Sequence, residues 1–211
     1  MASKTKRSHQ RSDHKAEGHN VKLSKLLSYT LRHGAEKEGL TISDCGFVSI
    51  ADILSHSKFR GFTFEDITKV VEENDKQRFS ILEKDGSSYI RANQGHSIPV
   101  PNLDIVQLKE GELPFAIHGT YDKCINTIKK MGLSKMKRQH IHMAVSEPGE
   151  SGVISGMRKS CDYIVTVDIA RAQADGLKFF RSANNVILTE GDENGLVLPK
   201  YFHSVKPRTN N

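Results

Sequence analysis

Four cationic side chains stand out because each lies where one predicted element ends and another begins. They are Arg32, His33, Arg78 and Arg138. A guanidinium group binds phosphate through two hydrogen bonds and stays charged at any working pH, whereas an imidazole titrates near neutral pH. Brought together, the four would form a phosphate site with a proton donor. Taken one at a time, each also fits an ordinary surface charge.

Three histidines in the second half of the chain form another set of candidates. His140 and His142 alternate with apolar residues, so both lie on one face of a predicted strand. The pair could ligate a metal ion, but no third ligand follows at helical or strand spacing, and we therefore expect no metal. In the run His118-Gly119-Thr120, the glycine would let a ligand approach the backbone closely. The same run also fits a turn with a solvated histidine.

Two glycine-containing segments are weaker candidates. The segment GVISGMR, which ends at Arg158, could bind a pyrophosphate through its backbone N–H groups or be an ordinary loop. The run Gly95-His96-Ser97 closes the first half of the chain and could face a cleft between domains, where ligands often bind. No Gly-x-Gly-x-x-Gly follows a predicted strand, and the sequence contains no Walker A motif. A Rossmann dinucleotide site is therefore disfavoured.

The first half of the chain has the pattern of three helices followed by a hairpin. The first helix is expected over Leu23–Gly34, because a glycine commonly ends a helix. Its apolar face consists of Leu23, Leu26, Leu27, Thr30 and Leu31. Ser49 and Thr63 have the form of N-caps for two later helices, and an Asp85-Gly86 turn joins two strands. This layout is that of a winged helix, a fold that binds nucleic acid or serves as a plain interaction module.

The second half is richer in strands. Residues 98–114 contain prolines, a glycine and several charges, which predicts a linker. A strand is expected over Phe115–Thr120, broken at Gly119, and the following helix over Tyr121–Met131 should end at Gly132. Further strands are expected over residues 163–169 and 185–188. Many strands with few helices predict a mixed or antiparallel sheet rather than a doubly wound one.

The composition narrows the class of partner. The 211 residues carry a formal net charge of +6, which favours a polyanionic partner such as RNA or DNA. Residues 1–20 are basic and almost free of apolar side chains, which predicts a disordered tail. No apolar run could span a membrane, and no signal peptide opens the chain. The cysteines are Cys45, Cys124 and Cys161, an odd and widely spaced set that fits a reducing compartment rather than a disulfide framework.

The motifs of the chain, taken in order, resemble those of the tRNA 2′-phosphotransferase family, and most closely its eukaryotic members. The segments that carry the resemblance are LSKLLSYTLRHG, GFVSIADIL, NDKQRF, IRANQGHS, HGT, RQHIHM, GVISGMR and FFRSANNVIL. The resemblance covers nearly everything from Val21 to Phe202. It implies an α+β fold with a winged-helix RNA-binding lobe over residues 21–97 and a linker over 98–114. Residues 115–211 would then form an ADP-ribosyltransferase-like lobe, a mixed or antiparallel β domain that binds NAD.

The resemblance also implies an activity and assigns residues to it. The enzyme would pass the splice-junction 2′-phosphate of tRNA to NAD through an ADP-ribosylated RNA. The products would be RNA with a 2′-hydroxyl, nicotinamide and ADP-ribose 1″,2″-cyclic phosphate. The family's essential Arg-His-Arg-Arg set falls on the four cationic residues Arg32, His33, Arg78 and Arg138. Its NAD-binding residues fall on His118, Gly119, Thr120, His140, His142 and Arg158, with no metal. The expected protein is a monomer that binds RNA and NAD, not membranes, in the cytoplasm, the nucleus or both.

Two alternatives to this activity remain open at the level of sequence. One is an RNA-binding module whose transferase half is inert, which would bind RNA without consuming NAD. The other is an ADP-ribosyltransferase that modifies terminal phosphates of RNA or DNA and stops after the first step, since that step is common to both reactions.

Overall fold

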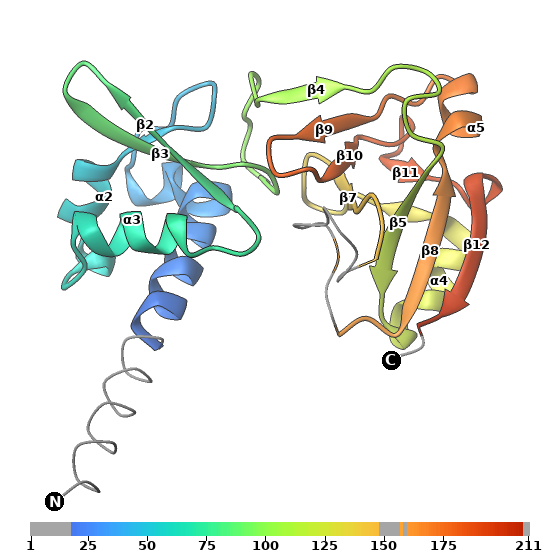
Figure 1. Cartoon of the computed structure of the whole chain (residues 1–211), viewed down its shortest axis with the longest axis horizontal. Coiled ribbons are helices and arrows are strands. Elements are labelled where there is room, and N and C mark those ends of the chain that lie inside the picture. The colour runs from blue at the N-terminus through green and yellow to red at the C-terminus, as the bar shows by residue number, and fades with distance from the viewer. Residues whose placement is uncertain (1–17, 148–156, 158–159, 209–211) are drawn as a thin grey trace, which may run out of the picture. The chain divides into compact units, whose positions relative to one another are not determined.

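The computed structural model describes residues 18–147, 157 and 160–208, and the chain divides into two compact units (Figure 1). Unit 1 contains the described residues up to Asn74 together with Arg78–Ala92. Unit 2 contains Asp75–Gln77 and the described residues from Asn93 onward. The chain therefore joins unit 2 for the short segment Asp75–Gln77 and returns to unit 1 at Arg78.

Unit 1 is built from helical segments and a three-stranded sheet. A helix covers residues 18–29 and is followed by the π-helical turn η1 (Thr30–Gly34) and the 3₁₀ turn η2 (Glu36–Glu38). The remaining elements are β1 (Val48–Ser49), α2 (Ile50–Ser55), η3 (Ser57–Phe59), α3 (Phe64–Glu72), β2 (Phe79–Lys84) and β3 (Ser87–Ala92). The strands are antiparallel in the order β1-β3-β2.

Local sequence signals explain where several of these elements begin and turn. The Ser49 side chain accepts a hydrogen bond from the Asp52 N–H at the start of α2. Thr63 and Asp66 form a complete capping box at the start of α3. The β2–β3 turn places both Asp85 and Gly86 in the left-handed region, with φ of 50° and 72°. These features confirm both caps and the hairpin.

The helical segment that begins at residue 18 ends its π-helical turn at Gly34 as expected, but Gly34 does not end it by adopting a left-handed conformation. The chain continues through the π-helical turn and η2, and the left-handed residue is Gly39, with φ of 71°. Gly34 is instead a packing glycine, because a Cβ there would lie 2.7 Å from Cε1 of Tyr29. Four of the five predicted face residues are fully buried: Leu23, Leu27, Thr30 and Leu31.

The helix also extends into the segment that was expected to be a disordered tail. Residues 18–20 are helical, and the His19 ring packs on Phe62 with a centroid separation of 4.5 Å. His19 Nε2 lies 3.4 Å from Oδ2 of Asp66. Residues 1–17 of that segment lie outside the described part of the chain.

Unit 2 contains two antiparallel sheets and a short two-stranded ladder (Figure 1). One sheet has the order β4-β9-β10-β7, the other the order β12-β8-β5, and β11 pairs with β6. Main-chain hydrogen bonds between Ile117 and Ala144 join β5 to the end of β7. The strands are β4 (Ile105–Gln107), β5 (Phe115–Thr120), β6 (Leu133–Ser134), β7 (Ile141–Met143), β8 (Tyr163–Asp168), β9 (Phe180–Ser182), β10 (Ile187–Thr189), β11 (Leu196–Val197) and β12 (Phe202–Pro207). The helical segments are α4 (Asp122–Met131), α5 (Ile169–Ala174) and η4 (Pro199–Tyr201).

Several details of unit 2 differ from the sequence expectation. The segment 98–114, expected to be a linker, contains β4, which pairs with β9 through Ile105 and Ser182. The strand β5 is not broken at Gly119, which pairs with Ile164 of β8. The last expected strand begins two residues late, because Asn185 has φ of 58° and lies in the connection between β9 and β10. The predicted end of α4 at Gly132 is confirmed.

The core of unit 2 lies among its sheets, α4 and α5. Its buried members include Ala116, Ile125, Val165, Ile169, Phe179 and Ile187. Every strand pairing among the described residues is antiparallel, which confirms a mixed α+β fold with few helices. Within that same part of the chain, no helix has both the length and the apolar character needed to cross a bilayer.

Candidate functional site

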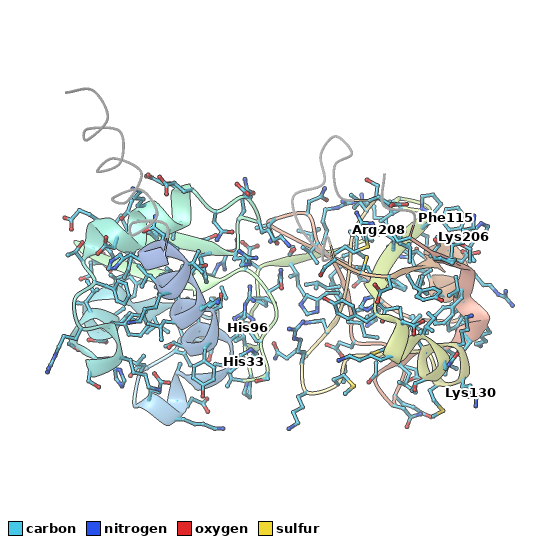
Figure 2. The ribbon with its side chains drawn as sticks, turned by 90° about the horizontal axis from the view of Figure 1, so that it is seen from below. His33, His96, Phe115, Lys130, Lys206 and Arg208 are labelled. Carbon is cyan, nitrogen blue, oxygen red and sulfur yellow. The ribbon has the colours of Figure 1, made fainter. Side chains whose placement is uncertain are left out.

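Arg32 and His33 lie in the π-helical turn η1 of unit 1 rather than on a regular helix end (His33 is labelled in Figure 2). Both side chains are half-buried. The His33 ring centroid lies 6.2 Å from that of Tyr29. A π-helical turn inserts an additional residue into the helical path, and such turns are frequent at functional sites. The unusual local geometry therefore coincides with two of the four predicted phosphate-binding residues.

A charged pair supports this turn from the adjoining segments. Lys58 forms an ion pair with Glu38, whose side chain is only 7% exposed. The Lys58 Nζ also lies 5.6 Å from the centroid of the Tyr29 ring, within range of a cation–π interaction. Tyr29 in turn packs against Gly34. These contacts fix the path of the chain on both sides of Arg32 and His33.

Arg78 is the third predicted residue, and it lies in unit 1 directly before β2. Its main-chain N–H and its Nη1 both face Oδ1 of Asn74, at 3.4 and 3.3 Å. The side chain is half-buried. The same carboxamide oxygen therefore contacts both ends of the residue, although both hydrogen bonds are longer than the usual 2.9–3.0 Å.

Arg138 is the fourth, and it lies in unit 2 on the loop between β6 and β7. Its side chain is exposed, and its N–H donates to the Lys135 carbonyl at 3.0 Å. The next N–H, that of Gln139, donates to the carbonyl of His96, also at 3.0 Å. The positive charge of Arg138 contributes to lowering the pKa of His118. The loop is thus anchored at its backbone while the guanidinium is exposed.

His118 is a neutral imidazole held in one tautomer. Burial is the main cause that lowers its pKa, Arg138 lowers it further, and a hydrogen bond to the backbone of His142 opposes them. That bond joins His118 Nδ1 to the His142 carbonyl oxygen at 2.8 Å. A carbonyl can only accept, so Nδ1 carries the proton and Nε2 carries the lone pair. His118 can therefore accept a hydrogen bond from a hydroxyl group of a ligand.

The neighbours of His118 on β5 are closely packed. A Cβ on Gly119 would lie 2.3 Å from Cγ of Met157 and 2.8 Å from Sγ of Cys161. Thr120 is buried and pairs with Tyr163 of β8. The expectation of a ligand-facing strand is therefore compatible with the geometry, whereas the alternative of a turn with a solvated histidine is wrong.

His140 directly precedes β7, and His142 lies in the middle of that strand, so the prediction that both belong to one strand is correct only for His142. His140 is buried, and burial is the main cause that lowers its pKa; Glu190 opposes this and Lys135 adds to it. His142 pairs with Leu188 of β10. Among the described residues, no three or more His, Cys, Asp or Glu side chains are grouped as metal ligands. The three cysteines are free thiols.

Residues 18–191 of the chain match the model of the family described as RNA 2′-phosphotransferase, Tpt1/KptA. The chain belongs to this family. It is 46% identical over 197 residues to tRNA 2′-phosphotransferase 1 of Danio rerio, and the aligned region covers 91% of this chain and 88% of the relative. It is 49% identical over 187 residues to tRNA 2′-phosphotransferase 1 of Homo sapiens, covering 87% of this chain and 74% of the relative. It is 39% identical over 180 residues to the tRNA 2′-phosphotransferase of Saccharomyces cerevisiae, covering 81% and 78%.

The structure brings some of the predicted residues of this family member together. Within unit 2, β5 and β7 place His118 beside the backbone of His142, and the Arg138 charge acts on His118. Arg32, His33 and Arg78 belong to unit 1. Arg158 lies outside the described residues.

Sequence reasoning missed two buried asparagines of unit 2. Asn93 and Asn184 are 5% and 0% exposed, and each donates a hydrogen bond to the backbone just before Arg78. Both lie inside motifs that carry the family resemblance, IRANQGHS and FFRSANNVIL, and their place in these motifs was the only sequence signal that could have indicated a role for them. Asparagine is usually exposed, so its type alone gave no reason to expect burial.

Proposed function

We propose that this chain is an NAD-dependent RNA 2′-phosphotransferase that transfers the splice-junction 2′-phosphate of tRNA to NAD. The observation that carries the proposal is the family match over residues 18–191 together with relatives named tRNA 2′-phosphotransferase. A tRNA substrate would place the protein where tRNA is processed, in the nucleus or the cytoplasm, and we expect it to act there as a monomer.

In this proposal unit 1 is a winged-helix lobe that binds RNA, and unit 2 is an ADP-ribosyltransferase-like lobe that binds NAD. The helices of unit 1 and its β2–β3 hairpin support the first assignment. The antiparallel sheets of unit 2 support the second. The residues proposed for NAD are His118, Gly119, Thr120, His140, His142 and Arg158.

The β5 part of this set fits a ligand rich in hydroxyl groups. Because Nδ1 of His118 donates to the His142 carbonyl, its Nε2 accepts, and a ribose hydroxyl is a suitable donor. The depressed pKa of His118 keeps the imidazole neutral at neutral pH, so Nε2 retains its lone pair. Gly119 lies next to it, and the space that a side chain would take there is filled by Met157 and Cys161, so this glycine supports the proposal only through the close packing of β5.

The cationic residues are assigned to the phosphate. NAD supplies an anomeric carbon from which nicotinamide leaves, and the RNA 2′-phosphate, already anionic, attacks it without a general base. In the second step the ribose 2″-hydroxyl attacks the phosphorus and expels the RNA 2′-oxygen. Arg32, Arg78 and Arg138 would stabilise the charge that this phosphoryl transfer develops. His33 would act in this step as acid–base or phosphate ligand.

The test uses a short RNA with one internal 2′-phosphate, NAD, and three proteins: the parent, Arg78→Ala, and Arg171→Ala as a matched control. Arg171 is an exposed arginine on α5 with no role in the proposed site. The parent should release nicotinamide and ADP-ribose cyclic phosphate in equal amounts. Loss of one charge-stabilising group should slow the second step of Arg78→Ala by roughly 10²–10³-fold, so that ADP-ribosylated RNA accumulates.

The outcomes separate the candidate functions. Cyclic phosphate from the parent supports the phosphotransferase. A parent that forms only stable ADP-ribosylated ends on RNA or DNA with terminal phosphates is an ADP-ribosyltransferase. A parent that binds RNA but releases no nicotinamide is an RNA-binding module, and the proposed reaction is then wrong.

A further inference from the structure

Two buried side-chain amides of unit 2 hold the backbone that immediately precedes Arg78. Asn184 Nδ2 donates to the Lys76 carbonyl oxygen at 2.9 Å, and Asn93 Nδ2 donates to the Gln77 carbonyl oxygen at 2.7 Å. A buried amide without a partner costs free energy, so each asparagine is strongly held to its carbonyl. Consecutive carbonyls are therefore fixed by residues that come from two distant parts of the sequence.

Gln77, which carries the second of these carbonyls and directly precedes Arg78, has an unusual backbone conformation. Gln77 has φ of 43°, in the left-handed region that residues other than glycine rarely adopt. Its side chain is exposed, so packing of that side chain does not account for the conformation. Strained residues of this kind persist only where the surroundings hold them, and they concentrate at functional sites. Here Asn184 and Asn93 hold the carbonyls of Lys76 and Gln77, which lie on the two sides of the Gln77 Cα.

The effect on Arg78 follows from peptide geometry. The carbonyl of Gln77 and the nitrogen of Arg78 belong to one planar peptide group. Fixing the Gln77 oxygen therefore fixes the plane from which the Arg78 Cα departs. At the opposite edge of the same peptide group, the Arg78 N–H faces Asn74 Oδ1, which also faces Nη1 of Arg78.

The two asparagines are themselves anchored. The Ser182 hydroxyl donates to Oδ1 of Asn184 at 2.8 Å, which directs its Nδ2 to Lys76. Asn93 lies in the buried segment 92–96, and the carbonyl of His96 at the end of that segment accepts a hydrogen bond from the Gln139 N–H (His96 is labelled in Figure 2). One segment of unit 2 thus bonds to the backbone next to Arg78 and to the backbone next to Arg138.

We propose that Asn93 and Asn184 are positioning residues that hold the Lys76–Gln77 backbone so that Arg78 is oriented for phosphoryl transfer. The inference rests on the proposed function and extends it to residues that do not themselves touch the substrate. Losing either donor should leave release of nicotinamide close to that of the parent. It should slow the second step by roughly 10- to 100-fold, the usual cost of misplacing a catalytic group.

The first test compares Asn93→Asp and Asn184→Asp with Asn126→Asp. Each change removes an amide donor at nearly constant volume, and Asn126 is exposed on α4, where the same change touches no backbone carbonyl of the 75–77 segment. In single turnovers with the 2′-phosphate RNA and NAD, the two buried variants should accumulate ADP-ribosylated RNA, whereas Asn126→Asp should not. A structural role alone would lower both products together and leave their ratio unchanged.

A second pair of variants tests the backbone directly. Gln77→Gly permits a positive φ without strain, whereas Gln77→Val strongly disfavours it. Because residue 77 is exposed, neither change disturbs a core, and this pair decides the matter if the buried variants fail to fold. We expect Gln77→Gly to keep the parent's product ratio and Gln77→Val to accumulate ADP-ribosylated RNA.

The failure of the inference and of the proposed function give different results. A parent that completes both steps, with Asp variants and Gln77→Val that keep its product ratio, contradicts the positioning role alone. A parent that releases no nicotinamide contradicts the proposed function, and with it the role assigned to Arg78.

Discussion

Replacing Gly119 by Ala tests whether the strand that contains His118 depends on close packing against a distant segment. A Cβ at this position would lie 2.3 Å from Cγ and 2.7 Å from Sδ of Met157, and 2.8 Å from Sγ of Cys161. Gly119 is held in register by its pairing with Ile164 of β8. The new methyl group must therefore displace these side chains or move the strand.

The size of the effect follows from the kind of contact. Overpacking a closely packed site typically costs about 1–3 kcal/mol in free energy of unfolding, and we expect Gly119→Ala to fall in this range. Met157→Ala alone should cost about 2–5 kcal/mol, because it leaves a cavity. In the double variant the methyl group added at position 119 fills part of that cavity. The double variant should therefore be more stable than the sum of the single changes by about 1–2 kcal/mol, a coupling typical of residues in contact.

Urea unfolding of the four proteins measures this cycle, and the KM for NAD measures its consequence for the site. We expect Gly119→Ala to raise the KM for NAD, because a shift of β5 moves His118, and Met157→Ala to restore part of the loss. Additive changes in free energy of unfolding would refute the packing argument. Coupled free energies with an unchanged KM would instead remove this strand from the NAD site.

Two further predictions concern stability. Gly132 has φ of 98°, and a Cβ there would lie 2.3 Å from the carbonyl oxygen of Val197, so Gly132→Ala should lower the free energy of unfolding by about 3 kcal/mol or more. Gly176 has φ of 92° but open space around it, so Gly176→Ala should lower it by only about 1–2 kcal/mol. Equal melting temperatures for the two variants would contradict this prediction. Because burial lowers the pKa of His118, the imidazole is protonated less readily in the folded state than in the unfolded state. The contribution of neutral His118 to the stability of the fold is therefore complete above about pH 6.5, and it is lost as the pH falls toward the pKa of the folded state. Urea unfolding between about pH 5 and pH 7.5 should therefore give a shallower pH dependence for His118→Gln than for the parent, and an equally steep one would argue against a desolvated neutral imidazole.

The features that sequence predicted correctly depend on a few neighbouring residues. The cap at Thr63 needs only the chain three residues ahead, and the Asp85-Gly86 turn needs only two adjacent residues that tolerate positive φ. Gly132 ends α4 for the same local reason. Such signals are complete within one turn of the chain, so they can be recognised without knowing the fold.

The features that sequence missed depend on partners far along the chain. The strand β4 forms because Ile105 pairs with Ser182, and the proline-containing sequence around β4 does not indicate this distant partner. Gly119 looked like the end of a strand, but its lack of a side chain makes room for Met157. β5 is paired on both sides, with β8 and with the end of β7, and the second pairing brings the His142 carbonyl to the His118 ring. Long-range pairing therefore sets the surroundings of these residues.

The candidate catalytic residues lie where local regularity is interrupted. A helical wheel of 3.6 residues per turn gives the wrong direction for the side chains of Arg32 and His33, because both residues lie in a π-helical turn, which contains more residues than a turn of an α-helix. Arg78 follows a left-handed Gln77 that no local signal explains and that two buried asparagines hold. Residue types and motif order can identify such groups from sequence, but their orientation depends on the contacts that stabilise each interruption. Variants that remove those contacts, rather than the charged groups themselves, are therefore the most direct test of how the site is organised.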